Sequence, residues 1–329
     1  MSLIANHNSQ ADSLVVTRQF DDIDAFAEAI KPLDITVNQL TPGCFLGSVN
    51  FANFGSLKFT HVNQNQGIRA IGLKSPSDLT FAIALQADQT PVVSHGCQIK
   101  AQHIVGFDPT RETDFITGKD SHIVLASVNE QVFHSLAEQM GCDLGQKFLQ
   151  QNSVRLHSAS LRLLKAYYQQ ITHIFSSQPS LFMQSQMPSL IVEDFVPLLI
   201  DTLGKIAPKK RYQPKPFRRY ALVKKAEEIA KLYRDKPLTL QKLCDELQTS
   251  SSALCYGFKE IFGMSPMAYI KMQRLNGVRR ALKNADPGKT SVMQLADDWG
   301  FWSPGHFGRD YKKMFGELPS ETLRISRCR

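Results

Sequence analysis

The feature that most constrains the fold of this chain is a pattern that residues 239–319 state twice. Each copy holds an apolar helix start, a polar turn and a second apolar stripe that ends in glycine and proline. The first copy carries these features at Leu240, Leu243, Cys244, Ser250, Leu254, Phe258, Gly263 and Pro266, and the second at Val292, Leu295, Ala296, Ser303, Phe307, Tyr311, Gly316 and Pro319. The copies are offset by 52 positions in the opening helix and by 53 in the closing helix. This spacing predicts two helix-turn-helix units in tandem, each with a second helix that can enter a DNA groove.

Charge is distributed unevenly between this segment and the rest of the chain. Residues 209–329 hold 25 Lys and Arg against 12 Asp and Glu, a net charge of +13, and residues 1–208 hold 13 against 18, a net charge of −5. A basic helical segment joined to a mildly acidic remainder predicts that nucleic acid is the partner of one end only.

Cysteine usage and hydropathy restrict the compartment. The cysteines are scattered without a C-x-x-C pair, which favours a reducing cytoplasm. No apolar run approaches the ~18 residues that a bilayer span needs, and the polar start lacks the features of a signal peptide. We therefore expect a cytoplasmic protein with no membrane partner, and we expect residues 1–14 to be disordered.

Residues 15–130 alternate short apolar runs with turn residues, a rhythm typical of an antiparallel barrel or sandwich. The runs that predict strands are 49–54, 56–62, 68–73, 79–85, 98–107 and 122–128. A ligand pocket inside such a barrel would be lined by alternate strand residues such as Phe51, Phe59, Ile71 and Phe81, which are equally plausible as ordinary core.

From residue 130 the period changes to that of helices. A helical face that recurs every three or four residues is predicted at Leu156, Ser160, Leu163, Tyr167, Ile171 and Ile174. Residues 190–206 predict a second helix interrupted near Pro197. These two helices either cover the open face of the barrel or pair two copies of the chain. Residues 206–219 follow as a basic, proline-rich linker.

The first unit is expected to follow a helix near 220–233 that buries Leu222, Ala226, Ile229 and Leu232 or Tyr233. Thr239 and Ser250 are candidate N-caps of its two helices. In the second unit Ser303 and Pro304 open the second helix, with an inward stripe at Phe307, Tyr311, Met314 and Phe315. A long helix from Pro266 would join the units, and two such helices in one chain can occupy successive major grooves.

Residues 219–323 resemble the AraC/XylS family of bacterial transcription regulators. The second copy carries the diagnostic residues: Gly300, Phe301, Phe307, Arg309, Tyr311, Lys312, Gly316 and Pro319. Segments 285–288 and 299–302 look closest to the branch that contains the ethanolamine-utilisation operon activator. The resemblance implies a two-domain α+β chain: a cupin-like β-barrel with a helical pair over 15–205, which senses a ligand and often dimerises, and an all-α tandem helix-turn-helix DNA-binding domain over 220–323.

The resemblance also implies functional positions. The base-facing residues would be Ser252, Cys255, Tyr256, Pro304, Gly305 and Arg309, and we expect phosphate contacts from Thr239, Lys259, Lys312 and Lys313. Only Arg309 carries a planar guanidinium group that can donate two hydrogen bonds to a guanine. The sequence departs from the usual family pattern at Cys244, at Gln248, where glycine is common, and at Gly257, which costs a helix about 1 kcal/mol against alanine.

Several of these positions have plainer explanations. Arg309 would pair with Asp310 or Asp297 on a solvated surface. Trp299, Phe301 and Trp302 would fill the core of the second unit rather than stack on bases. His95, Cys97 and His103 would converge on a metal only in the less favoured interpretation, so no metal and no cofactor is expected.

We therefore predict a non-enzymatic, sequence-specific regulator, an activator, that binds double-stranded promoter DNA and RNA polymerase. An unidentified small-molecule effector would bind the amino-terminal barrel, and a homodimer is compatible with the helical pair. One alternative is a ligand-independent dimeric regulator whose amino-terminal domain only makes protein contacts. The other is a metal-dependent enzyme tethered to DNA.

Overall fold

The computed structural model describes residues 14–30, 34–85, 92–100, 102–206 and 216–325. Except for Leu14, which begins the first strand, the residues 1–14 predicted to be disordered lie outside these ranges, as does most of the predicted linker at 206–219. None of the described helices is long and apolar enough to cross a membrane.

Among the described residues the strands form two antiparallel sheets. The larger sheet has the order β1-β3-β4-β11-β6-β9-β12 and the smaller sheet has the order β2-β5-β10-β7-β8. The strand bounds are β1 Leu14–Phe20, β2 Asp34–Gln39, β3 Gly47–Asn53, β4 Leu57–Gln64, β5 Ile68–Leu73, β6 Asp78–Ala84, β7 Val92–Ser94, β8 Cys97–Ile99, β9 His103–Val105, β10 Thr113–Thr117, β11 Ser121–Asn129 and β12 Ser153–Arg155. The two sheets face one another without closing into one barrel, and the predicted cupin-like fold is confirmed as an open one.

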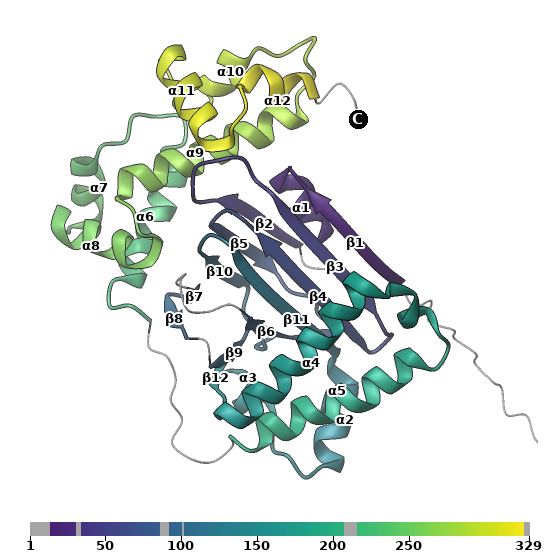
Figure 1. Ribbon diagram of the computed structural model, residues 1–329. Helices are drawn as coiled ribbons and strands as arrows, with labels where there is room; N and C mark the ends of the chain where they lie inside the picture. The colour runs from purple at the N-terminus through teal and green to yellow at the C-terminus, as the bar shows by residue number, and fades with distance from the viewer. Residues whose placement is uncertain (1–13, 31–33, 86–91, 101, 207–215, 326–329) are drawn as a thin grey trace, which may run out of the picture.

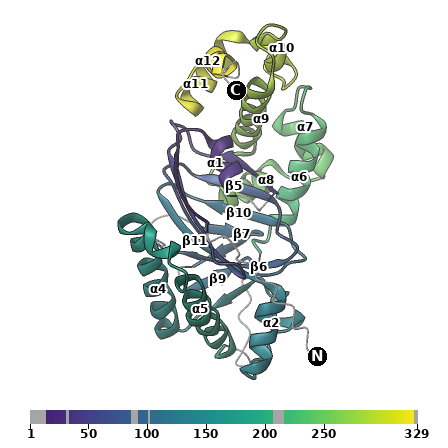
Figure 2. The ribbon, with the colours of Figure 1, turned by 90° about the vertical axis from the view of Figure 1, so that its right-hand side faces the viewer.

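The helices of the amino-terminal half gather mainly on the larger sheet. They are α1 Ile23–Ala29, α2 Glu130–Gln139, α3 Gln146–Leu149, α4 Ser158–Ser177, the 3-10 helix η1 Pro179–Met183 and α5 Met187–Gly204. Figures 1 and 2 show α4 and α5 beside the strands at one end of the molecule and the carboxyl-terminal helices at the other. The two-domain α+β architecture is therefore confirmed.

The main hydrophobic core lies between the larger sheet and α4 and α5. Phe59 and Phe81 from the sheet and Tyr168 and Phe195 from the helices are fully buried within it. The helical pair thus covers a sheet face, as the first of the two predicted roles required. The predicted face of α4 was wrong by one residue, because Leu164 is buried and Leu163 is 60% exposed.

Helix α5 runs through Pro197 without the predicted interruption. Proline removes one backbone donor and strains the preceding turn. Val196 and Leu199 are fully buried on either side of it, and their packing in the core offsets that cost.

A buried histidine gives the amino-terminal half a specific acid sensitivity. His61 is 6% exposed, and burial followed by the nearby His122 ring lowers its pKa to about 4. An unfolded histidine titrates near ~6.5, so between these values the unfolded chain binds a proton that the folded chain does not. We expect the free energy of unfolding to fall by about 3 kcal/mol from this residue as pH drops from 6.5 to 4. Urea unfolding of the parent and of His61→Gln at several pH values in this range measures the effect. If the free energy of unfolding fell equally steeply with pH in both proteins, His61 would not be its source.

The carboxyl-terminal half is helical throughout its described part. Its helices are α6 Tyr220–Leu232, α7 Leu240–Leu247, α8 Ser251–Phe262, α9 Pro266–Asn284, α10 Val292–Asp297, α11 Pro304–Phe315 and α12 Pro319–Ile325. Helices α6 and α9 lie against the outer face of the smaller sheet, where Leu40, Val93 and Ile116 join the core of the helical half.

Candidate nucleic-acid interface

The first helix-turn-helix unit consists of α7 and α8, and both predicted N-caps are present. The Thr239 hydroxyl accepts a hydrogen bond from the amide of Lys242 at 3.2 Å, and the Ser250 hydroxyl accepts one from the amide of Ala253 at 3.2 Å. On α8 the residues Leu254, Phe258 and Ile261 are buried, as the sequence spacing predicted. Of the two alternatives predicted at the end of the preceding helix, Tyr233 packs against the core and Leu232 is 75% exposed.

The turn of the first unit contains a strained residue. Gln248 ends α7 with φ 49° and ψ 47°, in the left-handed region that favours glycine. We expect Gln248→Gly to raise the free energy of unfolding by about 1 kcal/mol, because a side chain in this region costs about that much. Thermal unfolding of Gln248→Gly and of Gln248→Ala provides the comparison, since alanine retains the steric cost. Equal effects of the two substitutions would show that the backbone there is not strained.

The predicted base-facing residues of the first unit lie on the solvent side of α8. Ser252 is exposed, Tyr256 is 63% exposed and Cys255 is half-buried. The Arg219 guanidinium lies 5.7 Å from the centre of the Tyr256 ring, which restrains the phenol near the start of α6.

Gly257 has a packing role that the sequence did not reveal. A Cβ placed on it would lie 2.9 Å from the Cγ2 methyl of Val223 and 3.1 Å from Cβ of Arg219. Glycine therefore lets α6 approach α8 closely, which explains a residue that weakens an isolated helix.

The second unit consists of α10 and α11 and repeats this arrangement. Phe307, Tyr311, Met314 and Phe315 are buried, as predicted. Pro304 and Gly305 are exposed at the start of α11, and no atom lies within 4 Å of a Cβ built on Gly305. The amino end of α11 therefore leaves room for close approach of a partner backbone or base.

Arg309 is exposed on the same surface of α11. Its Nε donates to the Gly305 carbonyl at 3.1 Å, and its Nη2 lies 3.1 Å from Nδ1 of His306. The carboxylate of Asp310 pairs with Lys271 at 3.0 Å instead. Within the described ranges Arg309 forms no ion pair, so the plainer explanation through Asp310 or Asp297 was wrong.

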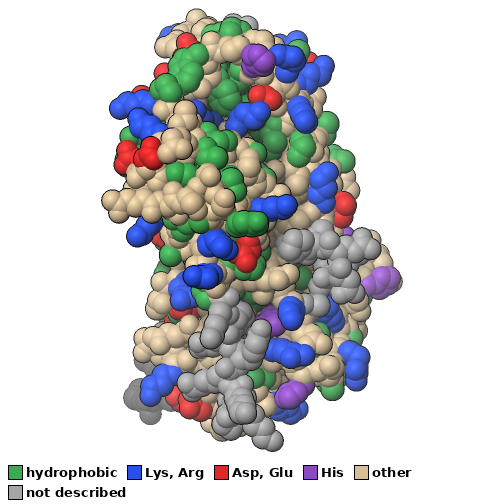
Figure 3. Space-filling model, turned by 90° about the vertical axis from the view of Figure 1, so that its left-hand side faces the viewer, with side chains coloured by type: hydrophobic (Ala, Val, Ile, Leu, Met, Phe, Trp, Pro, Cys, Tyr) green, Lys and Arg blue, Asp and Glu red, His purple; other side chains and the backbone are tan. Residues whose placement is uncertain are grey.

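The predicted phosphate contacts surround these two helices. Lys259 lies on α8 and Lys312 and Lys313 on α11, and all three are exposed, as is Thr239 at the start of α7. Figure 3 shows Lys and Arg side chains spread over the face of the molecule that carries α7 and α8. The lysines predicted to contact phosphate therefore lie on the exposed sides of α8 and α11, the second helices of the two units, and Thr239 lies at the start of α7.

Tryptophan 299 fixes the second unit to the connecting helix α9. A Cβ on Gly277 would lie 2.1 Å from Cζ3 of Trp299, so the indole packs directly on the helix backbone. Arg234 covers the ring at 5.0 Å. Trp299 and Phe301 pack against the core, whereas Trp302 is 54% exposed, so its predicted core role was wrong.

A cavity of about 740 Å³ runs beside Trp302 between α9 and the start of α11. His306 and Ser303 also line it.

The candidate effector pocket is a chamber between the two sheets. Its volume is about 100 Å³, and the surface that it presents is almost entirely apolar, although polar residues such as Gln64, Thr80 and Thr117 also form its walls. Val62, Ile68, Ala70, Phe115, Ile123 and Leu125 point into it. Of the four strand residues that were equally plausible as pocket lining or as ordinary core, Phe59 and Phe81 lie in the core beneath α4 and α5. Ile71 lines a different cavity, and Phe51 is not among the residues that line the chamber.

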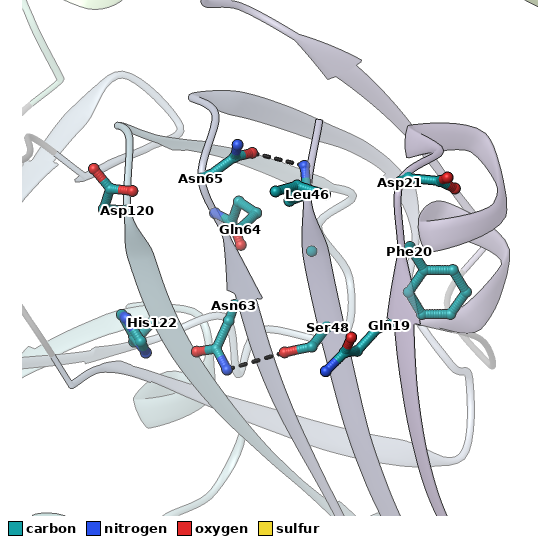
Figure 4. Close-up of a pocket in the computed structure, with 11 residues that line it drawn as sticks. Gln19, Phe20, Asp21, Leu46, Ser48, Asn63, Gln64, Asn65, Asp120 and His122 are labelled. Atoms are coloured by element: carbon teal, nitrogen blue, oxygen red, sulfur yellow. Dashed lines mark hydrogen bonds between the residues drawn. The ribbon is translucent and has the colours of Figure 1, made fainter. Parts of the chain in front are cut away.

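A second, polar groove lies on the larger sheet (Figure 4). It has a volume of about 600 Å³ and is lined by Gln19, Ser48, Asn63, Asp120 and His122 among others. Asn63 donates to the Ser48 hydroxyl at 3.1 Å inside it. This groove is open and hydrophilic, as is usual for the solvated part of an antiparallel sheet.

The residues weighed as metal ligands make backbone contacts. His95 lies 2.8 Å through Nε2 from the carbonyl of Glu112, and His103 lies 3.2 Å through Nδ1 from that of Lys100. No group of three or more His, Cys, Asp or Glu side chains in the described ranges could hold a metal ion.

A buried ion cluster joins the smaller sheet to helices α6 and α9; we call it the Arg69 cluster. Arg69 of β5 is 1% exposed and donates to both carboxylate oxygens of Asp114 at 2.8 and 2.9 Å. It also binds Glu227 of α6 and, at 2.5 Å, the hydroxyl of Tyr269 of α9. Burial opposes the charge on Asp114, but the Arg69 hydrogen bonds outweigh it and lower the pKa of that carboxyl.

A second cluster, the Arg279 cluster, joins α9 to the region around α1. Arg279 is 6% exposed and pairs with Asp22 at 2.7 Å, Asp24 at 2.5 Å and Glu317 at 3.3 Å. Burial raises the pKa of Asp22, but Arg279 and Lys283 outweigh it and hold that pKa below its usual range. Basic residues of α9 are therefore occupied by the amino-terminal half.

Backbone contacts complete the junction between the halves. The Asn276 amide pairs with the backbone of Gln39 in both directions at 3.0 Å, and Gln39 donates through Nε2 to the Met314 carbonyl at 2.9 Å. The sheet half therefore contacts α9 and the end of α11 at once.

Comparison with known proteins identifies the helical half. Residues 243–325 match the family described as a helix-turn-helix domain. The chain is 34% identical over 113 residues to the probable thc operon regulatory protein of Rhodococcus erythropolis, covering 34% of each chain. It is 33% identical over 94 residues to XylDLEGF operon transcriptional activator 2 of Pseudomonas putida, covering 29% of this chain and 60% of the relative.

Among solved structures, a probable AraC family transcriptional regulator from Rhodopseudomonas palustris is 36% identical over 32% of this chain and 97% of its own, with a TM-score of 0.29. The chain spans only about a third of the length of the first curated relative and three fifths of the second.

Proposed function

We propose that this chain is a sequence-specific transcription regulator that acts as an activator. The proposal starts from the helical half, which is an AraC-type helix-turn-helix domain. The observation that carries the proposal is the exposure of matching surfaces on α8 and α11, each held by a buried apolar stripe. Both relatives named above are operon regulators by name. Its partners would be promoter DNA and RNA polymerase, in the cytoplasm, and we assign it no enzymatic activity.

The base-facing set would be Ser252, Cys255, Tyr256, Pro304, Gly305 and Arg309. The phosphate-contacting set would be Thr239, Lys259, Lys312 and Lys313. Because the first set contains a single arginine, shape and apolar contacts would supply much of the specificity. The finer assignment to the branch of the ethanolamine-utilisation operon activator stays a prediction.

The linker at residues 206–219 would connect the sensing domain to the DNA-binding domain, and a small-molecule effector would bind in the chamber. Asp114 supports a route from the chamber to the DNA-binding half, because it lines the chamber and also holds Arg69. Tyr220 and Lys224 of α6 bind the same carboxylate at 3.0 and 3.4 Å. An effector that favours one arrangement of β10 would therefore change the position of α6.

A ligand-independent regulator is the second candidate. Leu163, Met183 and Leu190 on and beside α4 and α5 are each more than half exposed, which favours a contact surface for a second copy of the chain. In that case the sheet half would serve only as a protein interface.

The direct test of DNA recognition compares two substitutions on α11. With the full chain, Arg309→Ala should reduce the preference for a footprinted promoter site over scrambled duplex by about 5- to 150-fold. Lys313→Ala should weaken binding to both duplexes alike and lower the salt dependence, because it removes a phosphate contact. Arg18→Ala on the exposed side of β1 is the control. If Arg309→Ala still preferred the promoter site over scrambled duplex as strongly as the parent does, Arg309 would not be a base contact. If the parent protein itself showed no such preference, the proposed function would be refuted.

A further inference from the structure

The polar groove on the larger sheet has a regular floor. Directly opposite one another on β1, β3, β4 and β11 stand Gln19, Ser48, Asn63 and His122. Paired residues of neighbouring strands point to the same face, so these side chains form one polar row across the sheet, as Figure 4 shows. The same register continues two residues further in a second row, formed by Leu46, Asn65 and Asp120. Asn63 points away from the chamber, because its neighbour Val62 points into it.

Much of this polar surface has no partner within the described part of the protein. The lining side chains that form neither a hydrogen bond nor an ion pair with a described residue are those of Gln19, Asp21, Asp120 and His122. Asn63 donates through Nδ2 to the Ser48 hydroxyl at 3.1 Å, and its Oδ1 accepts from no described residue. The groove therefore presents amide, imidazole and carboxylate groups that a ligand can engage.

The charge of the lining disfavours an anionic ligand. Asp21 and Asp120 line the groove, and no Lys or Arg is among its described lining residues. The two acids adjoin β1 and β11, which β3 and β4 separate, so they stand about 14 Å apart with a neutral floor between them. An ammonium ion only donates, whereas a hydroxyl both donates and accepts, as the amide of Gln19 and the ring of His122 require. The floor thus favours a neutral ligand that is rich in hydroxyls.

The size of the groove suits about one or two sugar rings. A cavity of about 150 Å³ holds the six non-hydrogen atoms of benzene, so the groove of about 600 Å³ holds at most about 24 such atoms. A disaccharide of two hexoses has about that number. A sugar ring also has C–H groups on its faces, and Leu46, 60% exposed in the second row, supplies apolar surface for them.

One wall of the groove leads to the end of α11. Asn65 donates through Nδ2 to the Cys44 carbonyl at 3.1 Å and accepts through Oδ1 from the Leu46 amide at 2.8 Å, so it fixes the loop before β3. In that loop the Gly43 amide donates to the Met314 carbonyl at 3.0 Å. A ligand that engages Asn65 therefore touches the residue that holds this loop against the second unit.

The opposite wall leads to α9. Asp21 directly precedes Asp22, which pairs with Arg279 at 2.7 Å and also with Lys283. The two walls thus adjoin two segments on which α9 and α11 rest.

We propose that this groove binds a neutral, hydroxyl-rich ligand of about one or two sugar rings, with hydroxyls on the row from Gln19 to His122 and a C–H face on Leu46. The site is separate from the chamber. Its effect on DNA binding rests on the proposed function, because occupation would shift the contacts of Asp22 and Gly43 with the second unit and α9.

Saturation-transfer NMR on the full chain tests the ligand class. The panel holds the common pentoses, hexoses and their disaccharides, with succinate as the anionic probe and spermidine as the cationic probe. At least one sugar should bind with a Kd of about 1 mM or less, and both charged probes should bind at least about tenfold more weakly. Binding of no sugar, or tighter binding of succinate or spermidine than of every sugar, would overturn the inference.

Two variants place the sugar in the groove. Asn63→Leu keeps the size of the side chain but removes its hydrogen bonds, and should weaken sugar binding at least about tenfold. Gln19→Ala removes an exposed side chain with no described partner, so its folding is not at risk, and should weaken binding about three- to tenfold. Gln98→Ala, an exposed glutamine on β8, is the control and should keep the parent affinity. Parent affinity in both groove variants would show that the sugar binds elsewhere.

Promoter titrations with and without the sugar that binds best test the coupling. Saturating sugar should change the promoter affinity of the parent by at least about fivefold and leave that of Asn63→Leu unchanged at the same concentration. A sugar that binds in the groove without this change would overturn the coupling to the second unit. A protein that prefers its promoter to scrambled duplex but binds no sugar overturns the ligand site alone, and one that binds a sugar but prefers no promoter refutes the regulator and leaves the site standing.

Discussion

Arg69→Met is expected to lower the free energy of unfolding by about 3 to 5 kcal/mol, the largest effect of a single substitution that we foresee. The guanidinium is 1% exposed and neutralises Asp114 and Glu227, which come from opposite halves of the molecule. Without it two carboxylates stay buried close together, and among the described residues the cation that still pairs with them is the partly exposed Lys224. Removal of one partner from a buried ion network is costly because the remaining charge has lost its solvation.

Urea unfolding of the full chain measures this effect. Arg18→Met, on the exposed side of β1, is the matched control and should change the free energy by less than about 0.5 kcal/mol. Adding Asp114→Asn and Glu227→Gln to Arg69→Met should restore much of the loss, because the uncompensated charges are then gone. A loss below about 1 kcal/mol for Arg69→Met, or no recovery in the triple variant, would contradict a role as charge neutraliser.

Gly277→Ala is expected to destabilise the second unit by about 3 kcal/mol, although alanine is the better helix former by about 1 kcal/mol. The new methyl group would lie 2.1 Å from Cζ3 of Trp299, so the indole must leave its place on α9. Arg234 and the start of α11 would shift with it, and promoter affinity should fall.

Gly308→Ala on α11 provides the opposite expectation, because no atom lies within 4 Å of the added carbon. This substitution should stabilise the chain by up to about 1 kcal/mol. Thermal unfolding and tryptophan emission distinguish the two, since a displaced Trp299 becomes more solvated and its emission moves to longer wavelength. Similar stability changes for both glycines would show that Trp299 does not pack as described.

The helical half was largely predictable from sequence, because its apolar stripes recur at helical spacing. Phe258 and Phe307 are buried and Arg309 is exposed, as the repeat required. Two details escaped prediction. Gly257 appeared only as a local weakness and Gly277 gave no signal, yet each admits a neighbour that is distant in sequence, Val223 for the first and Trp299 for the second.

The sheet half was predictable only as a set of short strands. Strand β4 buries Phe59 on one face and Val62 on the other, so alternation could not tell the chamber from the core beneath α4 and α5. The partners of Arg69 lie 45 and 158 positions away, at Asp114 and Glu227. No local pattern indicates such pairs, and a single arginine in an apolar strand gives no sign of where its counter-ions lie.

Helix α9 spaces the two units and also supplies the surface on which the sheets rest, through Asn276 and Arg279. Hybrid proteins made by exchanging amino-terminal halves at residues 206–219 would therefore mismatch this junction even if both halves fold. A transplanted amino-terminal half would have to bring equivalents of Asp22, Asp24 and Gln39, or the recipient's α9 would have to be changed with it. The unit to exchange in engineering is the sheet half together with the face of α9 on which it docks.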